Sequence, residues 1–309
     1  MINRLLIRIK TLQILYNYYR VEGMSMNSAI GTLRKALDHS YKLYIYLCGI
    51  PLDIANIAED RLEREKEKFL KDTEVINILE HLSDNKLVNI IKSDETFCEE
   101  RQQIASLLQT RGLEDYLQTL TTSAVSYIQD VEKPINWDDF SEIRSIWRGF
   151  YGEKILQNEV FSELIEETST YLNDDIGIVF TFVTKAFNAI SEEKTFSEVL
   201  KPPFVNEADE DFGPILIEQS IINGDDYREL ISNYFKNWDK ERVSEMDYII
   251  MQLALTEAIH FPTIATRITI NEYLNLAHYY SAPNSYTFIN GILHELFTDL
   301  KKEGRIMGE

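Results

Sequence analysis

The chain has 309 residues, of which 44% are hydrophobic and 11% aromatic, and it contains only 12 glycines and 7 prolines. This composition excludes a largely disordered chain and favours helices joined by short loops around a sizeable core. The formal net charge of −20 argues against a general affinity for nucleic acid. Residues 1–24 differ, because they carry four basic residues and one acidic residue, so a polyanion is expected to bind there.

The first predicted element is an amphipathic helix over residues 3–20. Arg4 and Arg8 are four residues apart and therefore share one face of this helix. Two interpretations stay open: this face contacts a polyanion, or it is a solvated basic face on a packed helix. The core-facing stripe lies on another face; it has apolar spacings of three and four and consists of Leu5, Ile9, Leu12, Tyr16 and Tyr19.

Residues 25–204 are predicted to form an acidic, almost entirely helical segment that ends in a linker with two prolines, SEVLKPPFVNEADEDFG. Trp137, Trp147 and Phe150 are expected to pack inside this segment. Its two cysteines, Cys48 and Cys98, have neither metal nor redox spacing, so both are interpreted as ordinary thiols in a reducing compartment.

Helix starts become clearer after Asp211. Ser244 and Asp247 predict a capping box at the start of one helix, and Thr269 and Glu272 predict a capping box at the start of the next. The last helix is expected to open at Pro283-Asn284-Ser285. Its apolar stripes are predicted to be Phe288, Ile292, Leu296 and Leu300, with Ile289, Leu293 and Phe297 beside them.

Three residues in this region are unusual for packed helices. Gly291 lies mid-helix, where glycine costs up to about 1 kcal/mol relative to alanine, so we expect another backbone to approach it closely. Asn271 and Asn290 are predicted to bond backbone groups of neighbouring segments. On this interpretation they only lock helix pairs together. Asn284, Ser285 and Phe288 instead favour a ligand, because a helix N-terminus suits phosphate and an exposed aromatic ring suits base stacking.

The sequence offers no catalytic site. None of the five histidines belongs to a metal-binding motif or pairs with a nucleophile, and no glycine-rich phosphate loop occurs. We therefore predict a protein without enzymatic activity, metal or cofactor. No secretory signal or membrane-spanning segment is recognised, so we expect a cytoplasmic protein that does not contact membranes.

At this point the sequence resembles a known family, that of the transcription antitermination factor NusB. The N-terminal helix fits the family pattern R-x-x-x-R-x-x-x-x-Q-x-L-Y through Arg4, Arg8, Gln13, Leu15 and Tyr16. The C-terminal third fits through Asp211-Phe212, Trp238, Glu241, Arg242, Asp247, LALTE at 253–257, INE at 270–272, LA at 276–277 and FINGIL at 288–293.

The resemblance implies an all-α fold of two small helical bundles, here with an additional helical insert. The expected organisation is a first core helix in 1–24, an insertion of unknown role in 25–204 and the remaining core in 205–309. The family implies binding of the boxA element of ribosomal RNA transcripts together with NusE, a ribosomal small-subunit protein. Other Nus factors and RNA polymerase would join this complex, which suppresses premature termination.

Residue roles follow from the same resemblance. Contacts with RNA are expected from Arg4, Arg8, Gln13, Asn284, Ser285 and Phe288. Asp247 is expected at the NusE interface with its helix neighbours Ile250 and Met251. The residues that mark the family motif are Thr269, Asn271, Glu272, Asn290 and Gly291.

The chain also departs from the family pattern. Leu5 and Leu6 replace further arginines, so fewer phosphate contacts are expected, whereas Asn284 replaces an acidic residue and should favour RNA. Ala265 stands where the family has proline. Two alternatives remain: a helical protein–protein scaffold without RNA binding, and an RNA-binding module linked to a ribosomal RNA methyltransferase. The insert lacks the glycine-rich loop and catalytic cysteine that a methyltransferase needs.

Overall fold

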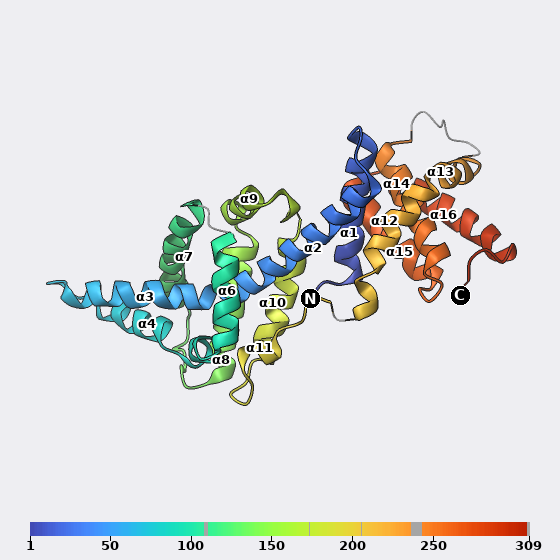
Figure 1. Cartoon of the computed structure of the whole chain (residues 1–309). Coiled ribbons are helices and arrows are strands. Elements are labelled where there is room, and N and C mark those ends of the chain that lie inside the picture. The colour runs from blue at the N-terminus through green and yellow to red at the C-terminus, as the bar shows by residue number, and fades with distance from the viewer. Residues whose placement is uncertain (108–110, 173, 205, 236–242, 308–309) are drawn as a thin grey trace. The chain divides into compact units, whose positions relative to one another are not determined.

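The computed structural model describes residues 1–107, 111–172, 174–204, 206–235 and 243–307, and these are almost entirely helical (Figure 1). Within these ranges the sole β feature is an isolated parallel bridge between Ile2 and Phe204. The predicted all-α fold class is therefore confirmed.

The chain divides into two compact units. One comprises Met1 and residues 38–203, and is called the insert unit below. The other comprises residues 2–37 and 204–309, and is called the core unit. The sequence analysis placed the boundaries at 24/25 and 204/205. Residues 25–37, which include the first part of α2, therefore fold with the core unit.

The core unit is built around α14. Buried residues lie on all sides of this helix, which is typical of a helix surrounded by others, and it packs against α1, α12, α13, α15 and α16. Eleven of the 16 residues of α14 are buried, so this helix forms the centre of the unit. The helices of the core unit are α1 (Arg4–Arg20), α2 (Met26–Cys48) in its first part, α12 (Phe212–Ile222), α13 (Gly224–Ser232), α14 (Glu245–His260), α15 (Thr266–Tyr280) and α16 (Ser285–Lys302), with a 3-10 turn at Glu207–Asp209.

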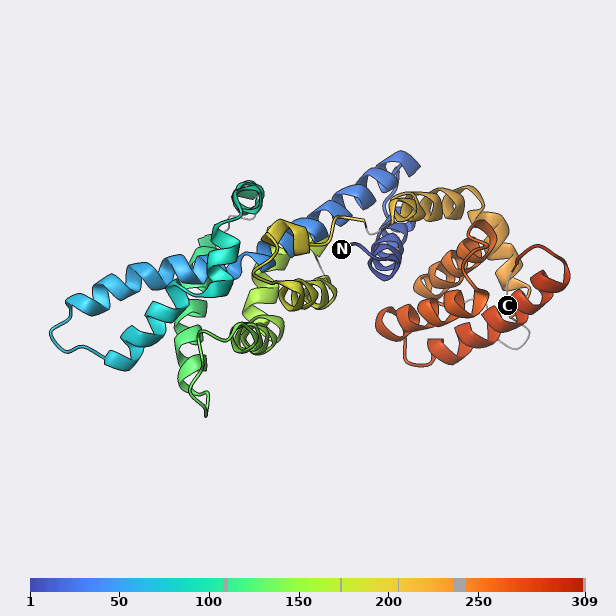
Figure 2. The same ribbon diagram turned by 90° about the horizontal axis from the view of Figure 1, so that it is seen from below.

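The insert unit has an aromatic core. Trp147 and Phe150 are each 2% exposed and meet edge to face, as the sequence predicted, whereas Trp137 is only half-buried. Figure 2 shows α3 and α4 running side by side as a long hairpin. The helices of the unit are the rest of α2, α3 (Ile50–Glu67), α4 (Thr73–Ser83), α5 (Lys86–Lys92), α6 (Glu95–Leu107), α7 (Arg111–Gln129), α8 (Phe140–Tyr151), α9 (Glu159–Thr168), α10 (Ile176–Ala189) and α11 (Phe196–Val199), with a π-helical turn at Gly152–Leu156 and a 3-10 turn at Thr170–Leu172.

The structure contains the helix cap predicted at Ser244 but not the one predicted at Thr269. Ser244 does cap α14, because its hydroxyl accepts a hydrogen bond from the Asp247 amide at 3.1 Å. The prediction for α15 was wrong: this helix begins at Thr266, one turn before Thr269. Thr269 lies inside the helix, and its hydroxyl donates to the buried Glu257 of α14 instead of capping a helix start.

The apolar stripes predicted for α16 are confirmed. All seven of their residues are buried, so this helix packs along its whole length against the core unit. Among the described residues, no helix is both long and apolar enough to cross a membrane.

Candidate functional site

A buried ion pair joins the N-terminal helix to the centre of the core unit. Arg8 of α1 is 4% exposed and donates from Nε and Nη2 to the two carboxylate oxygens of Glu257, at 2.7 and 2.9 Å. Glu257 is fully buried in α14 and also accepts a hydrogen bond from the Thr269 hydroxyl at 2.8 Å. The network therefore connects α1, α14 and α15, three helices that come from opposite ends of the sequence.

The charge on Arg8 is held in place by its surroundings. Burial opposes the charge, but the hydrogen bonds and the charge of Glu257, with smaller contributions from Tyr273 and Glu272, raise the pKa of Arg8 above its ordinary value. The Glu272 carboxylate lies 3.5 Å from Nη1 of Arg8. Glu272 thus belongs to the surface edge of this network and does not form a capping box with Thr269.

Arg4 lies one turn earlier and closer to solvent. Its side chain is 36% exposed, and its Nε donates to the Asp209 carboxylate at 2.8 Å. The guanidinium groups of Arg4 and Arg8 both lie over the ring of Phe212, at 5.2 and 5.4 Å from its centroid. The two arginines share a face, as expected, but Arg4 alone reaches the surface.

A second network joins two residues that were assigned to different interfaces. The Asp247 carboxylate accepts hydrogen bonds from the hydroxyls of Ser285, at 2.9 Å, and of Ser281. Asp247 and Ser285 are 5% and 6% exposed. The network ties the start of α14 to the start of α16, so both side chains hold the two helix ends together and neither presents its polar group to solvent.

Three further predicted contact residues lie inside the core unit. Ile250 and Met251 are fully buried, and Phe288 is 6% exposed with its ring 5.3 Å from that of Phe235. The expectation that Phe288 is an exposed stacking aromatic was wrong, because this residue begins the apolar stripe of α16. Ile250 and Met251 likewise face the helices that surround α14 and offer no surface to a partner.

The family-motif residues of α15 and α16 lie on the surface. Asn271 is exposed and Asn290 half-exposed, and within the described ranges neither side chain makes a hydrogen bond. The prediction that they bond neighbouring backbone was therefore wrong. The close approach predicted at Gly291 was also wrong, since a Cβ added there would meet nothing within 4 Å. Packing within the described chain explains none of the three.

The remaining predicted residues are accessible. Asn284 is exposed at the start of α16 and makes no side-chain cap, and Gln13 is half-buried on α1. Residues 236–242 lie outside the described residues, and with them Trp238, Glu241 and Arg242.

The sequence analysis did not recognise a cluster of tyrosines and arginines at the end of α1. The Arg20 guanidinium donates to the Tyr16 hydroxyl and lies 5.1 Å from the centroid of that ring. Arg228 of α13 lies 4.3 Å from the centroid of Tyr19, whose hydroxyl accepts from Gln252 at 2.8 Å. The spacing of Tyr16 and Arg20 by four residues was a signal, but Arg228 is more than 200 positions away.

Comparison with known proteins identifies the family. The family model described as "NusB family" matches residues 180–297, from within α10 to within α16. The transcription antitermination protein NusB of Finegoldia magna is 31% identical over 106 residues, which are 34% of this chain and 77% of that relative. The chain belongs to the NusB family.

Other NusB-family relatives match more partially. The NusB protein of Salinibacter ruber is 28% identical over 96 residues, which are 31% of this chain and 60% of that relative. The NusB protein of Gloeobacter violaceus is 27% identical over 148 residues, covering 47% of this chain and 68% of its own length. The chain thus spans somewhat more than half to about three quarters of these relatives, and no solved structure matches it.

The NusB-family match includes the stretches LALTE, INE and FINGIL. The matched range therefore contains Glu257 and Thr269 of the first buried network and Asp247 of the second. It also contains the exposed Asn271 and the half-exposed Asn290. Among the described residues, no group of three histidine, cysteine, aspartate or glutamate side chains is placed to hold a metal ion.

Proposed function

We propose that this NusB-family protein binds boxA RNA of ribosomal RNA transcripts together with NusE and, with other Nus factors and RNA polymerase, suppresses premature termination. The antitermination names of the relatives support the proposal. The observation that carries it is that Asn271, Asn284 and Asn290 reach the surface without any side-chain hydrogen bond in the described structure. Amides of this kind can read base edges or bond a partner's backbone.

The start of α16 is the proposed phosphate contact. This helix has 18 residues, and the Ser285 hydroxyl points to Asp247 instead of capping it. The Ser285 amide already donates to the Ala282 carbonyl at 2.9 Å, so the amides proposed to bind an anion are those of Tyr286 and Thr287. Arg4 is proposed as a separate phosphate contact, since its side chain is 36% exposed although its Nε donates to Asp209.

The buried residues receive positioning roles in the proposal. Arg8 fixes the orientation of α1 through Glu257, and Ser285 fixes the start of α16 through Asp247. Substituting them would disturb the RNA surface through the fold and not through lost contacts. For NusE, we propose the part of α14 that surrounds Asp247 and reaches solvent, with the half-exposed Glu245 and Tyr248.

The proposal is tested by the binding of labelled boxA RNA to the protein, with and without purified NusE, over a series of salt concentrations. We expect weak binding alone, because few cations are exposed, and stronger, salt-sensitive binding with NusE. Arg4→Ala should weaken the binding, and Lys92→Ala, at an exposed lysine of the insert unit, is the matched control. Binding of NusE without any RNA binding would contradict the proposal and favour a helical scaffold.

A further inference from the structure

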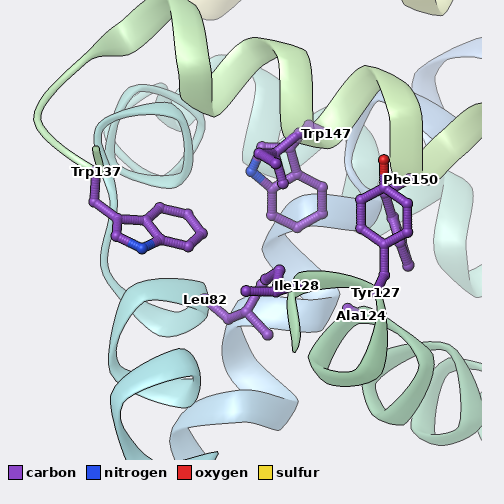
Figure 3. Close-up of a pocket in the computed structure, with 8 residues that line it drawn as sticks. Leu82, Ala124, Tyr127, Ile128, Trp137, Trp147 and Phe150 are labelled. Carbon is purple, nitrogen blue, oxygen red and sulfur yellow. The ribbon is translucent and has the colours of Figure 1, made fainter. Parts of the chain in front are cut away.

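The insert unit has an unusual apolar pocket between α4, α7 and α8. Trp147 lies in it with its indole nitrogen turned toward the space beside Trp137 (Figure 3). The cavity volume is about 10 Å³, room for one water molecule. The residues that line it are Leu82, Ala124, Tyr127, Ile128, Trp137, Ile146, Trp147 and Phe150.

The pocket holds an unpaired hydrogen-bond donor. Trp147 is 2% exposed, and within the described part of the chain its Nε1 has no hydrogen-bond partner. A water molecule would not remedy this, because a retained buried water needs two to four polar partners and the lining is almost wholly apolar. A buried unpaired donor is destabilising, so the pocket suits an apolar group that carries one acceptor.

Trp137 forms one wall of the pocket. It belongs to the connection between α7 and α8, is half-buried, and stacks on His81 with centroids 4.9 Å apart. Because this indole belongs to a connection and not to a helix, the proposal below has it move aside to enlarge the pocket.

The same unit carries an unpaired apolar tip. At the turn of the α3–α4 hairpin, Phe69 is 100% exposed and Leu70 is 83% exposed. Among the described residues, no hydrogen bond reaches the backbone carbonyls of residues 68–70. The tip therefore offers an aromatic ring and an aliphatic side chain together with free backbone acceptors. An acceptor is what Trp147 Nε1 lacks in the pocket.

Geometry prevents a tip from reaching its own pocket. The tip precedes the first residue of α4, whereas Leu82 and His81 lie at the opposite end of this 11-residue helix. At 1.5 Å per residue the two ends are about 16 Å apart. When two copies place α4 antiparallel across a two-fold axis, each tip meets the pocket of the other copy, and the assembly closes.

Local charges favour this pairing in spite of the acidic chain. The stretch around the pocket, DVEKPINWDD at 130–139, has four acidic residues and one basic residue. The tip, KEKFLKD at 66–72, has three lysines and two acidic residues. Lys66 forms an exposed ion pair with Glu80, which is weak enough to exchange partners, and Lys71 is exposed, whereas Lys68 pairs with the buried Glu65.

We propose that the insert unit is a self-association module. Phe69 and Leu70 of one protomer enter the pocket of its partner by displacing Trp137, and a tip carbonyl accepts the hydrogen bond of Trp147 Nε1. The partner is thus a second copy of this chain, bound through reciprocal contacts. The inference stands apart from the proposed RNA binding, and either can fail without the other.

Sedimentation of the full-length protein without RNA tests this proposal. A small contact of this kind predicts a monomer–dimer equilibrium with a dissociation constant of roughly 10–100 µM. Salt screens both the local attraction between the tip and the pocket and the repulsion between two net charges of −20, so dimerisation is measured at one fixed ionic strength.

Variants identify the surfaces. Phe69→Asp should weaken dimerisation at least tenfold without loss of stability, because its side chain makes no buried contact. Val160→Asp, at a 57% exposed valine of the same unit, is the matched control and should leave the equilibrium unchanged. Trp147→Phe keeps an aromatic ring and removes the donor, and it should also weaken dimerisation.

A mixing experiment decides between this contact and any other. Phe69→Asp retains an intact pocket and Trp147→Phe an intact tip, so an equimolar mixture should form a heterodimer more strongly than either variant forms a homodimer. The indole signal of Trp147 in a nitrogen-15 spectrum should shift with wild-type concentration. A wild-type monomer at about 500 µM, or a dimer that Phe69→Asp does not weaken, would overturn the proposal.

Discussion

Arg8 of α1 and Glu257 of α14 form a two-point ion pair, with donor–acceptor distances of 2.7 and 2.9 Å and less than 5% of either side chain exposed. The partners are 249 positions apart in the sequence. The pair therefore joins the first and last sequence segments of the core unit, which residues 38–203 separate in the chain. It makes one of the family-pattern arginines a part of the protein interior.

Removing one partner of this pair should strongly destabilise the core unit. Arg8→Ala is expected to lower the free energy of unfolding by about 3–5 kcal/mol, because Glu257 is left as an uncompensated buried charge. Replacing both residues with methionine should restore most of the loss. Urea denaturation followed by circular dichroism measures the effect. Arg4→Ala should lower stability by less than Arg8→Ala, because Arg4 is 36% exposed although its partner Asp209 is buried.

A loss in Arg8→Ala no larger than that in Arg4→Ala would show that the buried pair is not formed in solution. In that case Arg8 would again be available as a direct RNA contact.

Asn284→Asp should weaken RNA binding without destabilising the protein. The side chain is exposed at the N-terminus of α16, so a carboxylate there stabilises the helix dipole but repels a phosphate. We expect roughly three- to tenfold weaker binding of boxA RNA at low salt, with a difference that shrinks as salt is added. Asn77→Asp, an exposed asparagine on α4, is the matched control, and equal effects of the two substitutions would exclude a local contact at α16.

Gly291→Ala should stabilise the protein. Gly291 lies in the middle of α16 with open space where a Cβ would be, so alanine removes the cost of glycine and adds up to about 1 kcal/mol. Thermal unfolding measures this gain. If a partner helix approaches Gly291 in the antitermination complex, the larger Gly291→Leu should reduce binding of NusE or RNA. Unchanged binding by Gly291→Leu would show that no partner covers this position.

Asp94 should make the insert unit sensitive to acid. Burial alone would raise the pKa of this carboxyl, but hydrogen bonds from the backbone and hydroxyl of Ser197 and from the Phe97 amide lower the pKa below its ordinary value. A depressed folded-state pKa stabilises the fold above the unfolded-state value and loses this contribution as the pH falls through the folded-state value. The loss is therefore expected below about pH 4.

Asp94→Asn is the corresponding test. At neutral pH the variant should be less stable than wild type by about 1–2 kcal/mol, because an amide replaces the charged acceptor. The difference should become smaller as the pH is lowered from about 4 to about 2, since protonation removes the same charge in wild type. Urea denaturation at each pH measures it, and Asp130→Asn at an exposed position is the control. A difference independent of pH would show that the Asp94 carboxylate is not the stabilising form.

The sequence alone determined the helical class, the cap at Ser244 and the apolar stripes of α16, because local periodicity and capping chemistry specify these features. It also located the family motif, with Asn271 and Asn290 at positions that packing does not explain. Only the tertiary structure decided that Arg8, Ser285 and Phe288 turn inward. Periodicity identifies the face on which a residue lies, but burial depends on which helix packs against that face. For Arg8 and Ser285 the deciding partners, Glu257 and Asp247, come from distant parts of the chain, and a local pattern carries no information about them.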